Sequence, residues 1–321
     1  MMYRMLKYLV YCIGVCCLGW GVTSSVAASE LWLKDIPLNK LQELYQEAGY
    51  IGDKDYLAGR EYLMIETKAY PPIFLQKFPK EFFAVEDEQT RSWLFIKMLI
   101  PLALKLNEDL LAERKIIEDI NQITPVANLS EEQIKIIEEK AAKYDVFTRL
   151  KGEERYRYLL SELLLRIDVI PPSIILSMAA IDTNYGTSRA FREGNSLYKI
   201  LNWYSDEGLK PIGDDDAEYR IRIYPDIYAS LKDFALRFNS HPNFEFVRHT
   251  RSTLRENASS PRIQGRHIAA YSFANSELKN YAGILNYTIS YYELAIVDKS
   301  VLNNKMVTDD MVKKYSRYAK K

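Results

Sequence analysis

The stretch PPSIILSMAAIDTNYGTSRAFREGNSLYKI, residues 171–200, sets the frame for interpreting the whole chain. Its two prolines suit the first turn of a helix, where the missing N–H of proline would have no partner in any case. The apolar side chains that follow recur on most sides of that helix: Ile174, Ile175, Met178 and Ile181. Such coverage is typical of a helix that is buried on all faces. We therefore predict a buried helix that ends shortly before Gly186.

One carboxylate, Asp182, interrupts the apolar pattern in the last turn of this predicted helix. It lies at the negative end of the helix dipole and loses hydration there, so the fold gains nothing obvious from it. Burial raises the pKa of a carboxyl group because it disfavours the charged form. A carboxyl that stays protonated near neutral pH can act as a general acid. We take Asp182 as the candidate catalytic acid.

The residues after Asp182 resemble the glucosaminidase family, glycoside hydrolase family seventy-three, whose members cut the sugar strands of bacterial peptidoglycan. The match covers the GTSR and EGN motifs and the leucine after them: Gly186, Thr187, Ser188, Arg189, Glu193, Gly194, Asn195 and Leu197. Aspartate at position 182 replaces the family's catalytic glutamate, Tyr185 its usual tryptophan and Lys199 its final glycine. The resemblance implies a mainly α, lysozyme-like α+β domain with a small β-hairpin lobe.

Two further segments extend this resemblance to about residues 70–297. The upstream segments KFPKEF and RSWLFIKMLIPLALKLNEDLLAERK resemble the bacterial Bax-type branch of the family, which is unrelated to the apoptosis regulator of that name. Near the end of the domain, Tyr271 and Ser272 match a tyrosine–serine pair of the family. The resemblance implies that Tyr271 lines the cleft near the catalytic acid. The alternative is a packed tyrosine whose hydroxyl is bonded locally.

The start of the chain has the pattern of a signal peptide. Two basic residues precede an apolar run, small residues follow at 26–28, and all three cysteines lie within the first twenty residues. We expect cleavage after residue 28 and export to the periplasm or cell envelope, with an uncleaved membrane anchor as the alternative. Basic and acidic residues balance at 43 each, so no strong field favours nucleic acid as a partner.

The rest of the chain predicts three regions in order. Residues 29–125 form an N-terminal helical extension that contains a long helix from about 88 to 123. Residues 126–297 form the glucosaminidase-like domain, with a capping box at 130–133 and a helix at 153–166. Residues 298–321 form a polar tail, which we expect to be partly ordered.

Two stretches with alternating apolar residues, at 196–204 and 219–225, predict a short hairpin. The loop between them holds six carboxylates: Asp206, Glu207, Asp214, Asp215, Asp216 and Glu218. A glycosidase needs a second carboxylate opposite the acid, and the candidates are Asp214, Asp215, Asp216 and Glu218, of which we name Asp215 and Glu218 as site residues although the sequence does not choose among the four. The alternatives are a merely solvated acidic turn, a calcium loop of unusual spacing, or a substrate acetamido group that replaces the second carboxylate.

We expect the sugar strand to contact polar and aromatic residues around Asp182. The resemblance implies such contacts for Tyr185, Arg189 and Asn195, and aromatic rings suited to sugar faces are at Tyr198, Trp203 and Tyr224. Aromatic residues in strands belong to the core more often than to a sugar platform. Arg248, Arg251 and Arg255 predict an ion-pair seam or, as the alternative, a wall-binding patch, and His241 predicts a structural role. We expect no metal and no organic cofactor.

Two functions of different classes follow. The first is a peptidoglycan hydrolase of the endo-β-N-acetylglucosaminidase type, with Asp182 as the general acid. The second is a non-catalytic peptidoglycan-binding or scaffolding protein on the same fold, since Asp182 is one methylene shorter than the glutamate that the family uses. Peptidoglycan glycan strands are the expected partner in both cases.

Overall fold

The computed structural model describes residues 30–51, 69–214, 216–257, 264–272 and 280–319. Helices predominate in these ranges and the strands are short. The predicted class, a mainly α chain with a minor β component, is confirmed.

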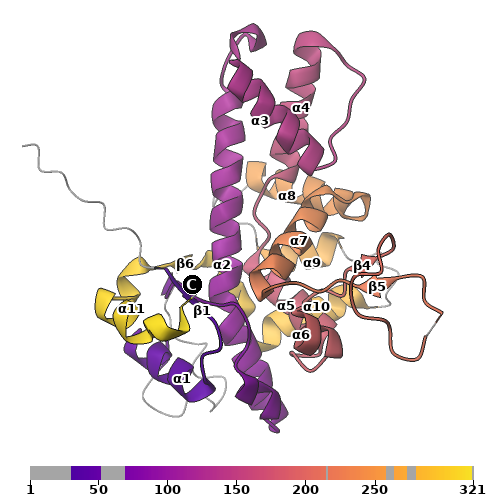
Figure 1. The fold of residues 1–321 in the computed structure, drawn as a ribbon. Coiled ribbons are helices and arrows are strands. Elements are labelled where there is room, and N and C mark those ends of the chain that lie inside the picture. Colours follow the sequence, from indigo (N-terminus) through magenta and orange to yellow (C-terminus); the bar gives the residue numbers. More distant parts are fainter. Residues whose placement is uncertain (1–29, 52–68, 215, 258–263, 273–279, 320–321) are drawn as a thin grey trace, which may run out of the picture.

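Helix α2 (Glu88–Asn121) is the element on which the others are assembled. Its 34 residues span about 51 Å at 1.5 Å per residue. Asp87 caps its first turn by accepting a hydrogen bond from Thr90 N at 2.7 Å. Residues 92–104 of the helix are buried on every side, because other elements cover α2 all around at this level. Figure 1 shows α2 running through most of the height of the molecule. The helix predicted at about 88–123 is confirmed.

Helices α3 (Glu131–Lys143) and α4 (Gly152–Arg166) pack against the C-terminal end of α2. They form an apolar cluster of their own with Ile117 and Ile120 of α2. The predicted capping box is present: Gln133 N donates to Ser130 Oγ at 3.2 Å and Ser130 N donates to Gln133 Oε1 at 2.9 Å. The two predicted helix starts in this region are therefore correct to within a residue or so.

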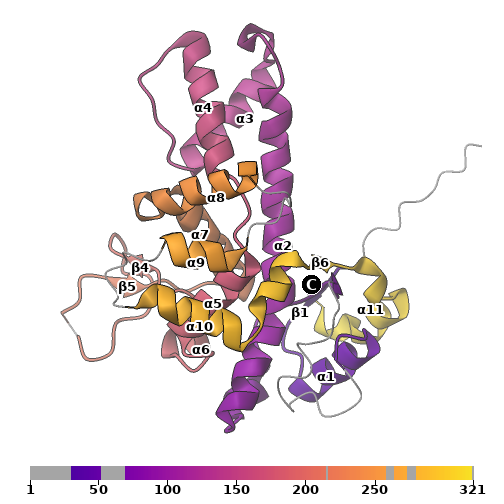
Figure 2. The ribbon, with the colours of Figure 1, turned by 180° about the vertical axis from the view of Figure 1, so that it is seen from behind.

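Six helices lie on one side of the other half of α2 (Figures 1 and 2). They are α5 (Pro172–Thr183), α6 (Arg189–Gly194), α7 (Ile227–Ser240), α8 (Glu245–Asn257), α9 (Gly265–Ser272) and α10 (Tyr281–Tyr291). Helix α5 lies in the centre of this group, and ten of its twelve residues are buried. The prediction of a helix buried on all faces is confirmed.

The predicted hairpin forms between α6 and α7, but its paired strands are shorter than expected. Strands β4 (Leu201–Asn202) and β5 (Arg220–Ile221) pair antiparallel. The residues beyond these pairs do not continue the ladder, and Tyr224 N bonds to Gly194 O at the end of α6 at 2.8 Å. The loop between the strands extends away from the helices in both views (Figures 1 and 2).

The opposite side of α2 carries a unit built from both ends of the described chain (Figure 2). Strand β1 (Leu31–Leu33) pairs parallel with β3 (Ile73–Leu75), and β2 (Ala69–Tyr70) pairs parallel with β6 (Val301–Leu302). Helices α1 (Leu38–Glu47) and α11 (Asp309–Tyr315) complete the unit. The N-terminal extension is thus not purely helical, and the polar tail is more structured than its composition predicts.

The predicted signal peptide, residues 1–28, and Asp215 lie outside the described residues. None of the described helices combines the length and the apolar character that a membrane span requires.

Candidate functional site

Asp182 lies in the last turn of α5, where the buried helix reaches the surface. Its side chain is half-buried, and burial raises its pKa to about 6, an effect that the positive charge of Lys199 partly offsets. No residue in the described part of the chain donates a hydrogen bond to this carboxyl. It therefore has the properties of a group kept available for proton transfer.

The backbone turns sharply straight after Asp182. Asn184, Tyr185 and Gly186 have φ values of 47°, 52° and 81°, a run of left-handed conformations that is costly for the two residues with side chains. A Cβ on Gly186 would lie 2.9 Å from ring atoms of Phe82 and Phe95, so only glycine fits. Such backbone strain clusters at functional sites, and here it follows the candidate acid by two residues.

Two tyrosines and a lysine surround Asp182. The charge of Asp182 contributes to raising the pKa of Tyr198 and of Tyr281, although burial is the larger cause for both. Lys199 has a φ of 46°, which favours the glycine of the family pattern at this position. The sequence did not predict Tyr281 and Lys199 as neighbours of the acid. Tyr281 lies about 100 residues further along the chain, and Lys199 was noted only as a replacement for the glycine of the family pattern.

The matched motif residues mostly build the joint between α5, α6 and the hairpin. Ser188 Oγ caps α6 by accepting from Phe191 N at 3.3 Å. Arg189 pairs with Glu193 at 2.9 Å and donates to Lys210 O at 3.0 Å. Asn195 ends α6 with a φ of 51° and donates to Tyr224 O at 2.8 Å. The motif therefore explains local structure, and it places the hairpin relative to Asp182.

The predicted sugar-contacting aromatics divide into buried and exposed rings. Tyr198 is buried, stacks on Phe234 with ring centroids 3.8 Å apart and donates to Ile175 O at 3.2 Å. A sugar-stacking role for Tyr198 is therefore wrong for this conformation, because a core ring already covers one face. Trp203 remains 56 % exposed and contacts the ring of Tyr219 at 4.9 Å.

The other two predicted aromatics are partly engaged within the protein. Tyr224 is half-buried and donates its hydroxyl hydrogen to Asp233 Oδ2 at 2.6 Å, which braces the hairpin against α7. Tyr185 is half-buried, and its ring lies 5.5 Å from the ring of Tyr292. The structure thus leaves Trp203 most open to a ligand among the predicted rings.

The structure does not bring a second carboxylate next to Asp182 within the described residues. Glu218, Asp214 and Asp216 are exposed in the hairpin loop, and no described carboxylate contributes to the pKa of Asp182. Asp215, the fourth candidate, is not described. Tyr271 lies on α9, and its side chain falls outside the described part. The identity of the second catalytic group stays a prediction.

The three arginines of α8 form a structural seam. Arg255 Nε donates to Asp168 Oδ2 at 2.9 Å, and Arg251 donates to Asn239 Oδ1 at 2.7 Å and to Val169 O at 3.0 Å. Arg248 donates to His241 O at 2.8 Å. The predicted ion pairs are confirmed for Arg251 and Arg255, which both pair with Asp168, whereas Arg248 bonds to a backbone carbonyl. His241 is structural as predicted, since its Nδ1 accepts from Asn243 N at 3.2 Å.

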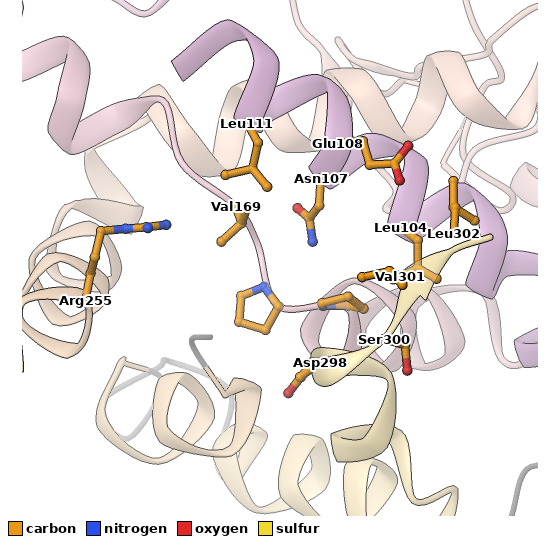
Figure 3. Close-up of a pocket in the computed structure, with 12 residues that line it drawn as sticks. Leu104, Asn107, Glu108, Leu111, Val169, Arg255, Asp298, Ser300, Val301 and Leu302 are labelled. Carbon is orange, nitrogen blue, oxygen red and sulfur yellow. The ribbon is translucent and has the colours of Figure 1, made fainter. Parts of the chain in front are cut away.

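A pocket of about 310 Å³ lies elsewhere, between α2, residues 169–172 and β6 (Figure 3). Asp182 does not line it. Its polar side chains are largely engaged: Asn107 bonds both backbone groups of Ile170, and Asp298 accepts three hydrogen bonds. Among the described residues no group of three or more His, Cys, Asp or Glu side chains is placed to hold a metal.

Comparison with known proteins finds one limited likeness. The chain is similar to Protein bax of Escherichia coli (strain K12), with 29 % identity over 100 residues. The aligned segment covers 29 % of this chain and 33 % of that protein, about a third of its length. No protein-family model matches the chain, and the search of solved structures returns no match. The likeness supports a Bax-like relationship over that segment.

Proposed function

We propose that this chain is an exported peptidoglycan hydrolase of the Bax-type glucosaminidases, glycoside hydrolase family seventy-three, with a lysozyme-like domain and Asp182 as its general acid. The observation that carries the proposal is the setting of Asp182: a carboxyl at the end of a buried helix, with its pKa raised to about 6 by burial. At pH 6 about half of these carboxyls hold the proton that a leaving glycosidic oxygen needs.

In the proposed reaction, Asp182 donates its proton to the oxygen that links two sugars as the bond to the anomeric carbon breaks. The oxocarbenium-like state then needs a negative group or a nucleophile on its other face. Asp215 or Glu218 of the hairpin loop is one source, at about 5–5.5 Å from the acid for retention or about 6.5–9.5 Å for inversion. The acetamido group of the substrate is the other source, and the lack of a coupled carboxylate among the described residues favours it.

The substrate contacts that we propose lie on both sides of the strained turn. Trp203 offers an exposed ring at the base of the hairpin, and Tyr185 offers a half-buried one beside Asp182. Arg189 and Asn195 hold the loop and hairpin in place through their bonds to Lys210 O and Tyr224 O. Arg189 and Asn195 therefore support substrate binding by holding the hairpin in place as much as by contacting the sugar.

The second candidate function is a non-catalytic glycan-binding protein. Aspartate is one methylene shorter than glutamate, so its carboxyl oxygen withdraws by roughly 1.5 Å, about one bond length. A misplacement of about 1 Å can reduce a rate on the order of 10²-fold. The absence of a second carboxylate beside Asp182 in the described residues favours this reading too.

Digestion of purified sacculi by residues 29–321 distinguishes the two functions. We expect the wild type to release reducing ends, with a rate that falls as the pH rises through about 6 because Asp182 loses its proton. Asp182→Asn is expected to lower the rate by at least about 10²-fold. Asp119→Asn, an exposed aspartate in the last turn of α2, is the matched control and should leave the rate unchanged.

The opposite pattern would overturn the hydrolase proposal. If the wild type binds sacculi but releases no reducing ends, and Asp182→Glu gains cleavage, the chain is a binding protein that has lost its acid. A wild-type rate that Asp182→Asn does not change would remove Asp182 from the mechanism.

A further inference from the structure

Helix α10 presents a face to solvent that has no charged residue of its own. The helix contains no Asp, Glu, Lys or Arg at all. Its exposed residues recur at helical spacing along one side: Gly283, Ile284, Tyr287, Ser290 and Tyr291. Exposed faces of surface helices usually carry charged side chains, so the lack of any from α10 itself calls for an explanation.

The two tyrosines on this face have nearly parallel rings. The centroids of Tyr287 and Tyr291 are 5.8 Å apart with 22° between the ring planes, and the side chains are 66 % and 42 % exposed. Behind them, the buried Trp93 lies 6.5 Å from Tyr291 at 26°. Tyr292 contacts both Tyr291 and Trp93 edge-on, at 4.8 and 4.7 Å. The orientation of Tyr291 is thus fixed by packing, and the ring of Tyr287 lies nearly parallel to it.

Buried rings connect this face with the surroundings of Asp182. Tyr292, which directly follows α10, lies 5.5 Å from the ring of Tyr185 in the turn after Asp182. At the other end of α10, the pKa of Tyr281 is raised by burial and by the charge of Asp182. Helices α5 and α10 pack side by side (Figures 1 and 2). A chain of rings therefore leads from the candidate acid to the exposed face.

We propose that Ile284, Tyr287 and Tyr291 form a binding subsite for the neutral sugar rings of a β-1,4-linked N-acetyl-amino-sugar strand, beyond the unit held at Asp182. The proposal rests on the proposed substrate. The apolar C–H faces of a pyranose ring pack on flat aromatic rings, and the tyrosine hydroxyls are left to bond its polar rim. Arg266 of α9 donates to Ser290 Oγ on this face at 3.1 Å. One basic side chain among the described residues here is less than the positively charged groove that nucleic acid requires beside its aromatic platforms.

A second copy of this chain is the other occupant that such a face fits, since self-association also buries uncharged aromatic side chains. The packing of α10 against α5, the helix that carries Asp182, favours the sugar strand. The two occupants predict different results in one set of measurements.

The test measures binding in the Asp182→Asn background, where cleavage does not consume the ligand. The probes are purified sacculi in a pull-down assay and the β-1,4-linked N-acetylglucosamine hexamer in calorimetry. We expect Tyr287→Ala with Tyr291→Ala to raise the Kd by at least 10-fold, and Tyr287→Phe with Tyr291→Phe to stay within 3-fold. Phe147→Ala with Tyr158→Ala, two exposed aromatics away from α10, is the matched control and should leave the Kd unchanged.

Circular dichroism and light scattering accompany each variant. An unchanged Kd in a folded alanine variant would overturn the proposal, and so would a parent protein that binds neither probe. A parent dimer that the alanine pair converts to monomers, with glycan affinity intact, would assign the face to self-association. Because the background lacks the acid, a failure of the hydrolase proposal leaves this binding test unaffected.

Discussion

Ionisation of Asp182 lowers the stability of the fold, because its carboxyl is partly buried. Burial raises its pKa from 3.8 to about 6, so the folded protein favours the protonated form. The stability that this form provides is fully present below pH 3.8 and is lost as the pH rises through about 6. The shift corresponds to at most about 3 kcal/mol, and to about 1–2 kcal/mol once the partial exposure of the group is allowed for.

We therefore predict that Asp182→Asn stabilises the fold at pH 7.5 by about 1–2 kcal/mol and has almost no effect at pH 4, because asparagine mimics the neutral acid in size and charge. Thermal unfolding at the two pH values measures this, with Asp119→Asn as the control that should show no pH-dependent gain. An equal effect of Asp182→Asn at both pH values would mean that the carboxyl is not desolvated in the folded state. Gain of stability on removing a charged group is typical of functional sites.

Sequence reasoning reached Asp182 and Tyr185 because a local pattern exposes them, a carboxylate within an apolar run and a motif after it. It could not reach Tyr281 as a neighbour of the acid, since that contact depends on how α10 crosses α5. Tyr287 and Tyr291 were missed for another reason. Their helical spacing with Ile284 is the pattern of a buried stripe, and only the fold shows that this stripe faces solvent.

At the level of elements, one carboxylate joins the starts of two helices. Asp298 is buried and accepts hydrogen bonds of 2.8 Å from Ser173 N and Ser173 Oγ in the first turn of α5. It accepts a third, also of 2.8 Å, from Gly265 N at the start of α9. A Cβ on Gly265 would lie only 2.0 Å from Ser173 Oγ. The side chains at the start of α5 thus leave no space for a methyl group at Gly265, and this contact fixes the helix that carries Asp182.

We predict that Gly265→Ala lowers the free energy of unfolding by about 2–3 kcal/mol through overpacking. Ser173→Ala is expected to cost about 1–2 kcal/mol, since it removes one hydrogen bond to a charged group and leaves the other two donors in place. In the Ser173→Ala background, Gly265→Ala should cost at least about 1 kcal/mol less, because the colliding oxygen is gone. Urea unfolding of the four proteins in this cycle provides the coupling energy. Strict additivity would show that the clash is relieved by movement of α9.

The elements that sequence predicted well are those set by local interactions. The long helix, the capping box at Ser130 and the buried helix α5 each depend on residues within one or two turns of one another. The parallel pairs β1–β3 and β2–β6 were not predicted, because strands of two or three residues carry no readable period and their partners lie far apart in the sequence. Strand β6 in the polar tail was not predicted for the same reason.

For the whole molecule, α2 separates two structural units and belongs to both. The helices around α5 pack on one side and carry the candidate site, while the unit formed by the two ends of the described chain packs on the other (Figures 1 and 2). Strand β6 begins three residues after Asp298, so the tail leads directly from the contact between α5 and α9 into this second unit. The tail therefore connects the helices of the site with the N-terminal strands.

Tyr315 of α11 is the residue through which this connection is best tested. Its ring is 2 % exposed, and its hydroxyl donates to Glu47 Oε1 of α1 at 3.2 Å. We predict that Tyr315→Ala lowers the free energy of unfolding by about 3–4 kcal/mol, as for other buried aromatic rings. Amide exchange should rise first at residues 31–33, since Leu33 bridges Ala319 at the end of the tail, and at residues 73–75, which pair with them. It should rise less around α5.

Tyr204→Ala, which removes a ring that is 97 % exposed in the hairpin loop, is the matched control and should change the free energy of unfolding by less than about 0.5 kcal/mol. If Tyr315→Ala leaves exchange at residues 31–33 unaltered, the tail does not stabilise the N-terminal strands. If exchange rises equally in α5, the two sides of α2 unfold as one cooperative unit, and damage to the tail would then reach the turn that holds Asp182.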